Sequence, residues 1–221
     1  MKKIIVGIII FWQSIGLTQE SKFHLGFQFF PNLSTGIDNN KNINTEYYKG
    51  IETFVFSFSG GLQIDLNLNQ SWSLSSGLLF CKTGDKSKIF PPDVYRGFFF
   101  SRQYITKIYY AEIPILISRN IGEHWSVELG VSALLNIAAK RFMKENDNEK
   151  INLNFGEDDI NLFGMYTNFG IGYRKNIGSH LLKITPYFQF NLFDGIKSVQ
   201  FIDYFPERKN LSVGLKCSFI F

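Results

Sequence analysis

Residues 53–68 alternate between apolar and small or polar side chains along the whole segment. The even positions are Phe54, Phe56, Phe58, Gly60, Leu62, Ile64, Leu66 and Leu68, and the odd positions are Val55, Ser57, Ser59, Gly61, Gln63, Asp65 and Asn67. Successive side chains of a β-strand point to opposite faces, whereas a helix would scatter these residues around its axis. The segment therefore predicts a strand with one apolar face and one polar face.

The same alternation recurs along the chain and predicts eight strands in all. The other seven segments are 23–29, 72–80, 104–118, 125–137, 164–174, 182–192 and 210–221. Segment 104–118 is the least regular, because both of its faces are fairly apolar. We assign Tyr109 and Ile113 to the outer face and Pro114 to the inner face. Proline cannot donate a ladder hydrogen bond, so Pro114 is expected at a bulge or a locally unpaired position.

The connections between these segments alternate in length. Short ones are expected at 69–71, 119–124 and 175–180, and long polar ones at 31–52, 83–103, 138–160 and 194–208. Outer-membrane barrels have short periplasmic turns and long external loops. The pattern therefore predicts an all-β fold, an eight-stranded antiparallel up-and-down transmembrane β-barrel. Its N-terminus would be periplasmic, and the last strand, ending at Phe221, would close on the same side.

The composition of the two faces indicates which one is outside. A soluble barrel also alternates, but its apolar residues point inward. Here the polar face is rich in Gly and Ser, which suits the narrow lumen of an eight-stranded barrel better than a water-facing surface. Trp72, Trp125 and Tyr173 lie beside expected short turns and Tyr109 lies toward the long loops. Two aromatic girdles of this kind are typical of a membrane barrel in contact with outer-membrane lipid.

The N-terminus has the order of a secretory signal peptide. Lys2 and Lys3 precede an apolar stretch at 4–12, and small residues precede an expected cleavage site near Thr18. We therefore divide the chain into a signal peptide at 1–18 and a barrel domain at 19–221. No later apolar run approaches the roughly 20 residues that a transmembrane helix needs. Loss of the two signal lysines lowers the net charge from +4 to +2, which is too weak to indicate nucleic-acid binding.

Several motifs resemble one known family. The segment YYAEIPILIS, which contains Glu112 and Pro114, and the glycine-rich NFGIGYR resemble strands of the Bacteroidota-type outer-membrane β-barrel family, small OmpA/OmpX-like barrels of the porin family. The resemblance covers essentially the mature chain, although ITPYFQFNLF lacks the Arg that often precedes the position of Tyr187. It implies a bacterial outer-membrane location and says little about role. The terminal Phe221 resembles the signal that the barrel-insertion machinery reads.

Six charged residues are expected to face the lumen: Asp65, Glu112, Glu128, Arg174, Lys183 and Lys216. Buried charges need partners. Mixed signs in a narrow lumen favour a salt-bridged polar plug, and a narrow ion path is the alternative.

Four basic residues lie in or beside the expected connection 83–103, namely Lys86, Lys88, Arg96 and Arg102, close to the run Phe98-Phe99-Phe100. They could contact lipopolysaccharide phosphates or a partner protein. A solvated loop whose aromatic residues fold back onto the barrel rim is an equally good interpretation.

The histidines do not form a convincing reaction site. His124 and His180 are expected in exposed turns without companions at metal-ligand spacing. His24 could join Ser57 or Ser59 in a catalytic trio, but it faces the lumen, away from any lipid substrate. We therefore expect no catalytic, cofactor or metal site and no enzyme. The sequence favours a structural or interaction protein that acts through its external loops, with an envelope protein as partner. A narrow channel for ions or small solutes, or an accessory subunit of an outer-membrane secretion or assembly machine, remain as alternatives.

Overall fold

A computed structural model describes residues 23–38, 52–87, 101–145, 149–153, 162–192 and 208–221. The expected signal peptide at 1–18 lies outside the described residues, as do Lys88 and Arg96 of the expected basic loop.

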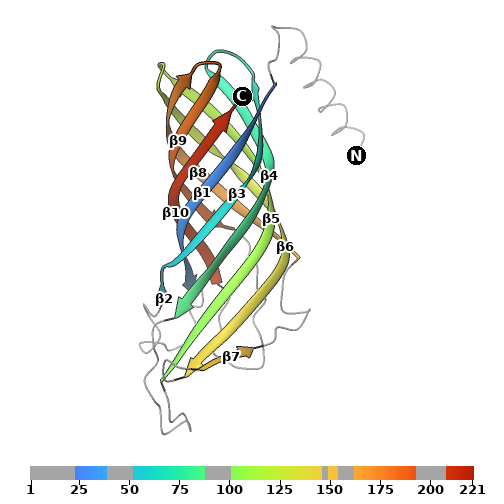
Figure 1. Ribbon diagram of the computed structural model, residues 1–221, viewed down its shortest axis with the longest axis vertical. Coiled ribbons are helices and arrows are strands. Elements are labelled where there is room, and N and C mark those ends of the chain that lie inside the picture. Colours follow the sequence, from blue (N-terminus) through green and yellow to red (C-terminus); the bar gives the residue numbers. More distant parts are fainter. Residues whose placement is uncertain (1–22, 39–51, 88–100, 146–148, 154–161, 193–207) are drawn as a thin grey trace.

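Eight of the strands in the described residues close into one antiparallel barrel (Figure 1). They are β1 (Phe23–Asp38), β3 (Val55–Asn67), β4 (Trp72–Ser87), β5 (Arg102–Ile121), β6 (Trp125–Glu145), β8 (Phe163–Ile177), β9 (His180–Asn191) and β10 (Arg208–Ile220). Each strand pairs with the next, and β1 pairs with both β3 and β10, which closes the ring. The short strands β2 (Glu52–Thr53) and β7 (Glu149–Leu153) pair with β4 and β6 outside this ring. The predicted eight-stranded up-and-down barrel is confirmed.

The first and last strands meet at one end of the barrel, which we call the terminal end. There the N–H of Phe221 donates to the carbonyl oxygen of Leu25 at 2.8 Å. The three short connections, 68–71, 122–124 and 178–179, lie at the same end. Two of them turn on Gly122 and Gly178, whose φ angles of 65° and 62° are unfavourable for residues with a Cβ. We call the opposite end the loop end.

The strands run further than hydropathy predicts, so the expected connection boundaries are wrong. β1 continues through Pro31 to Asp38, β4 continues to Ser87 and β6 to Glu145. The predicted short turns at 119–124 and 175–180 are likewise shortened, because β5 and β8 extend to 121 and 177. Backbone pairing needs no apolar face, so a ladder continues after the alternation of side chains has ended. Apolar alternation therefore marks only the part of each strand whose outward side chains face an apolar environment.

Three prolines occupy gaps in the ladders. The β4–β5 pairing is interrupted where Gly77 and Leu78 would face Pro114 and Ile113. The β1–β10 and β8–β9 ladders are interrupted in the same way at Pro31 and Pro186. On its other side each proline sits in an unbroken ladder. The expectation that Pro114 occupies a locally unpaired position is confirmed. The N–H and C=O groups of a strand residue point to the same neighbouring strand, and proline has no N–H to donate on that side.

The barrel is apolar outside and polar inside. Leu62 and Leu129 on the outer wall are each 58% exposed, while the lumenal Ser57 and Ser132 are at most 1% exposed. Trp125 and Tyr173 meet on the outer wall at the terminal end, with ring centroids 5.6 Å apart. These positions confirm the outward assignment of the apolar face and exclude a soluble barrel with an apolar interior.

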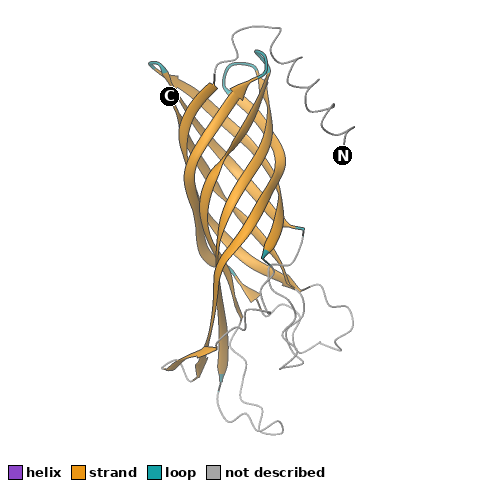
Figure 2. Ribbon diagram, turned by 90° about the vertical axis from the view of Figure 1, so that its right-hand side faces the viewer, coloured by secondary structure: helices purple, strands orange, loops and turns teal. Residues whose placement is uncertain are grey.

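Three strands extend beyond the ring at the loop end (Figures 1 and 2). Pairing of β6 with β8 ends at Leu135, whereas its pairing with β5 continues to Glu145. At about 3.3 Å per residue, this extension is roughly 30 Å long. A bulge at Ile137, which has no partner between the pairs Tyr110–Asn136 and Tyr109–Ala138, marks its start. We call segments 82–87, 102–109 and 136–145 the projecting sheet.

Candidate functional site

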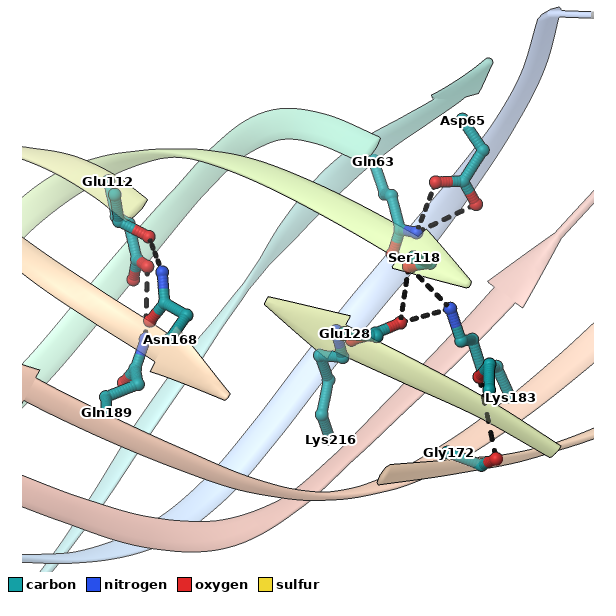
Figure 3. A network of polar contacts seen from close by, with 12 residues as sticks. Gln63, Asp65, Glu112, Ser118, Glu128, Asn168, Gly172, Lys183, Gln189 and Lys216 are labelled. Carbon is teal, nitrogen blue, oxygen red and sulfur yellow. Dashed lines mark hydrogen bonds and ion pairs between the residues drawn. The ribbon is translucent and has the colours of Figure 1, made fainter. Parts of the chain in front are cut away.

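The lumen near the terminal end contains an ion-paired cluster of three side chains from three strands. Lys183 of β9 pairs with Oε1 of Glu128, and Lys216 of β10 pairs with Oε2 (Figure 3). The side chains of Glu128 and Lys216 are each only 2% exposed, and that of Lys183 is 7% exposed. Lys183 lies directly opposite Ser218 on β10, one inward position from Lys216, so the two ammonium groups enter the lumen side by side. One carboxylate therefore neutralises two cations only in part.

Neighbouring groups hold this cluster in place. The hydroxyl group of Ser118 donates to Glu128 Oε1 and accepts from Lys183 Nζ, at 3.4 Å in both cases. The ammonium group of Lys216 lies 4.4 Å from the ring centroid of Tyr187, close enough for a cation–π interaction. A Cβ on Gly170 would lie 2.7 Å from the Tyr187 ring. The glycine-rich inner face of β8 thus makes room for the large side chains that β9 directs inward.

A layer of apolar side chains lies beside the ion-paired cluster. Phe30, Leu116 and Tyr187 pack together, and at most 4% of any of them is exposed. The rings of Phe30 and Tyr187 meet edge to face with centroids 5.2 Å apart. Leu116 has the same parity as Pro114, which the sequence places on the inner face, but sequence reasoning did not identify this layer. The alternation that assigned the charged residues to the lumen also assigns these three apolar residues to the inner face, so it could have identified the layer.

Glu112 and Asp65 lie in the lumen but outside the ion-paired cluster (Figure 3). Glu112 accepts hydrogen bonds from the thiol of Cys81 at 2.9 Å and from the amide of Gln189 at 3.1 Å. Asp65 accepts from the amide of Gln63, which lies 2.9 Å from both carboxylate oxygens. Both carboxylates thus bond to neutral groups, which sequence reasoning did not identify as their partners.

Arg174 lies apart from the other lumenal charges, at the terminal end. Its guanidinium group donates to the carbonyl oxygens of Glu123 at 3.0 Å and Gly122 at 3.1 Å. The prediction that Arg174 joins a single lumenal network is therefore wrong. Its position in the alternation does correspond to the inner face of β8. The residue is so near the end of the strand, however, that its long side chain reaches the neighbouring turn and not the other lumenal charges.

A second lumenal group lies toward the loop end. The hydroxyl groups of Tyr110 and Tyr166 are 2.6 Å apart and fully buried, with Leu79, Cys81, Ile108 and Leu134 packed around them. The sequence does not predict this group as a unit, because alternation within single strands does not show that Tyr110 of β5 and Tyr166 of β8 meet across the lumen. Cys81 belongs to it, whereas Cys217 is on an outward position of β10, so the two cysteines face opposite sides of the wall.

The expected basic loop is divided by the strand ends. Lys86 lies on β4 and Arg102 on β5, so neither is a loop residue. Lys88 and Arg96, together with the run at 98–100, fall outside the described residues. The two basic residues that the structure describes therefore belong to the strands on either side of this segment.

The histidines take separate positions at the terminal end. His24 pairs with Asp65 across β1 and β3, and its Nδ1 is 3.2 Å from the carbonyl oxygen of Phe221. Ser57 and Ser59 lie opposite Asn32 and Phe30, six or more residues along β1 from His24, so the imagined trio is not assembled. His180 is half-buried against the rings of Phe219 and Phe221, which corrects its assignment to an exposed turn.

Within the described segments, no three His, Cys, Asp or Glu side chains are grouped so that they could hold a metal ion. The same segments contain no helix with the length and apolar character needed to cross a membrane.

Residues 14–198 match the family described as outer membrane protein beta-barrel domain. No curated protein matches the chain in sequence. Among solved structures, the chain is similar to Neisserial surface protein A (NspA), at 7% identity and a TM-score of 0.46, over 92% of this chain and 100% of that chain. It is also similar to Ail, the attachment invasion locus protein of Yersinia pestis, at 12% identity and a TM-score of 0.44, over 92% of this chain and 100% of that chain.

Proposed function

The chain belongs to the family of outer membrane β-barrel domains, and from this premise we propose that it has a packed, non-conducting lumen and acts through its loop end. Family membership places the protein in the bacterial outer membrane. The proposal adds a non-enzymatic role, either structural or in binding an envelope protein. The observation that carries it is the contrast between a filled lumen and a sheet that extends past the barrel at one end.

The filled lumen argues against the channel alternative. The apolar side chains of Phe30, Leu116 and Tyr187 fill part of the lumen, and both lysines of the neighbouring cluster are held by Glu128. An ion crossing the lumen would have to shed water at the apolar layer and compete with a buried ion pair. An eight-stranded barrel is only just wide enough for its own side chains, so these groups have no space to move aside.

We expect the full-length protein to be silent in planar lipid bilayers. The measurement is single-channel current across a range of voltages, with insertion verified by recovery of the folded barrel from the same bilayers. A sixteen-stranded porin, whose lumen holds an aqueous channel, is the control for the recording conditions. Reproducible current steps from the wild-type protein would overturn the packed-lumen proposal and favour a narrow channel for ions or small solutes.

The loop end supports the interaction role. The projecting sheet extends beyond the barrel wall and pairs there with the short strands β2 and β7, and the described part of the terminal end carries only tight turns. Long connections on one side are typical of the external face of outer-membrane barrels, so we propose that the loop end is external and the N-terminus periplasmic. The accessory-subunit role remains a prediction from the sequence, which recovery of a stoichiometric envelope complex would favour.

Orientation can be tested in intact cells. We expect a short epitope inserted between residues 93 and 94 to bind antibody on whole cells, because this position is in the connection between β4 and β5 at the loop end. An epitope inserted in the turn between Asn69 and Gln70 at the terminal end is the matched control and should react only after the outer membrane is opened. The reverse labelling pattern would show that the barrel is inserted the other way.

A further inference from the structure

The outward face of the projecting sheet carries five lysines from three adjacent strands. They are Lys82 and Lys86 of β4, Lys107 of β5, and Lys140 and Lys144 of β6, and we call them the lysine patch. Their facing follows from the register. Lys82 lies opposite the outward Tyr109, Gly84 lies opposite Lys107, and Lys107 lies opposite Lys140. All five side chains are half-buried or exposed, so their ammonium groups are accessible from outside the barrel.

The lysine patch has no acidic partner among the described side chains. The ion pairs among those residues are the lumenal ones of Glu128, and none involves the patch. Lys107 and Lys140 are direct cross-strand neighbours. Side chains in that relation have Cβ atoms about 5 Å apart, and like charges there are destabilising. Two facing lysines on an open surface therefore favour an anion that binds between them.

Aromatic rings lie beneath the patch. The ammonium group of Lys82 is 5.8 Å from the ring centroid of Phe58, and that of Lys107 is 5.2 Å from the ring centroid of Phe142. Phe80 and Tyr109 stack next to them with centroids 6.2 Å apart. Long basic side chains commonly lay their apolar stems on such surfaces and keep the charge in the polar region beyond. The aromatic residues mark the level at which the apolar wall ends.

The height of the patch can be estimated along β5. The outward residues from Ile121 to Tyr109 span twelve positions, which for a strand tilted by about 40° is roughly 30 Å along the membrane normal. This length matches an apolar band of about 25 Å with an aromatic girdle at each edge. Lys107 lies two residues beyond Tyr109 in the direction of the loop end, or about 5 Å further out. The first lysines therefore lie at the level of lipid headgroups.

The patch also extends outward in two tiers. Lys82, Lys107 and Lys140 form the tier near the girdle, and Lys86 and Lys144 come four residues further along their strands from Lys82 and Lys140. Four residues correspond to about 13 Å of strand, or roughly 10 Å along the normal. A glycerophospholipid presents its phosphate at one depth. Two tiers suit a lipid with phosphate groups on sugars at more than one depth.

We propose that the lysine patch binds the phosphate groups of the phosphorylated glycolipid that forms the outer leaflet of the bacterial outer membrane. The phosphates would lie between Lys107 and Lys140 and along the second tier, and would relieve the repulsion between the facing lysines. The inference rests on the proposed function in one respect, because it takes the loop end to be external. It assigns a ligand class to a surface on the strands, which shares only Lys86 with the basic residues that the sequence indicated.

The test is glycolipid binding to the purified full-length protein in detergent, measured by titration at several salt concentrations. The probes are diphosphorylated lipid A, the same lipid with both phosphates removed, and phosphatidylglycerol. We expect the wild type to prefer the diphosphorylated glycolipid and to lose affinity as salt rises. The double variant Lys107→Gln/Lys140→Gln should bind it roughly 25-fold more weakly, since one lysine near an anionic lipid surface contributes about fivefold. The variant Lys86→Gln/Lys144→Gln should abolish the preference over phosphatidylglycerol.

The matched control is Arg119→Gln/Lys175→Gln, which removes two exposed outward charges at the terminal end. It should change binding by less than about twofold. All variants should remain folded, and in lipid-free detergent Lys107→Gln/Lys140→Gln should be at least as stable as the wild type, because a like-charge pair is removed. Equal wild-type affinity for the dephosphorylated glycolipid or for phosphatidylglycerol would overturn the proposal, and so would an equal loss in the control. Because binding is measured on purified protein, an unexpected epitope orientation would overturn the proposed orientation without affecting this result.

Discussion

Replacing Glu128 by glutamine should destabilise the barrel by about 3–5 kcal/mol, the usual consequence of removing one partner from a buried ion pair. Glu128 is the only carboxylate that contacts Lys183 and Lys216 among the ion pairs of the described residues. Glutamine keeps the size of the side chain but leaves two ammonium groups in the lumen without a counter-charge. The measurement is the free energy of unfolding by urea in lipid vesicles, followed by tryptophan fluorescence.

Two further variants make the interpretation specific. Glu123→Gln makes the same chemical change on an exposed turn residue and should alter stability by no more than about 0.5 kcal/mol. The triple variant Lys183→Met/Glu128→Leu/Lys216→Met removes all three charges and should recover most of the loss, because apolar replacement of a buried charge cluster is often neutral or stabilising. A change below about 1 kcal/mol for Glu128→Gln would indicate that water screens the lysines and that the lumen is not a packed plug.

Replacing Leu62 by arginine should destabilise the inserted barrel by about 2–4 kcal/mol, the value for a basic residue on the lipid-facing wall near the bilayer midplane. Leu62 lies midway along β3 and pairs with Phe27 and Leu78, so the new charge would have only apolar neighbours. Its side chain is 58% exposed in the isolated barrel, which means that lipid and not protein would surround the guanidinium group. The same unfolding measurement in vesicles gives the result.

Ile105→Arg is the matched control for Leu62→Arg. Ile105 faces outward on the projecting sheet, between Lys86 and Phe142, beyond the apolar band. The same substitution there should cost less than about 1 kcal/mol, because lipid-facing penalties decline toward the interface. Equal effects at both positions would contradict the placement of the apolar band between the terminal-end girdle and Tyr109.

The barrel was predictable because the signal that specifies it is local. In residues 53–68, the odd or even position of each residue indicates the face of the strand to which its side chain points. The length of the polar sequence between two such segments indicates whether a tight turn joins them. Pro114 was informative for the same reason, since a missing N–H has a local consequence. The signal peptide, the reading of Phe221 by the insertion machinery and the narrower resemblance to Bacteroidota-type barrels remain predictions, because they concern residues or partners that the barrel geometry does not involve.

The strand ends and the candidate sites were not predictable in the same way. β4, β5 and β6 continue past the apolar wall because backbone pairing with a neighbour sustains a strand even where its side chains are polar. Sequence reasoning therefore placed Lys86 in a loop and did not consider Lys107, Lys140 and Lys144 together. Their proximity depends on the register between strands, which is set by the whole ring and by the bulge at Ile137.

By itself, the sequence determined which side chains face lipid and which face the lumen, because alternation along one strand decides that residue by residue. Only the tertiary structure decided which lumenal groups meet. Glu128 forms ion pairs with both Lys183 and Lys216. Glu112 accepts hydrogen bonds from Cys81 and Gln189, and Arg174 donates to a turn at the terminal end. Parity assigns a residue to a face, but the level at which it enters the lumen depends on the stagger of eight strands around a closed ring, and that stagger is a property of the ring as a whole.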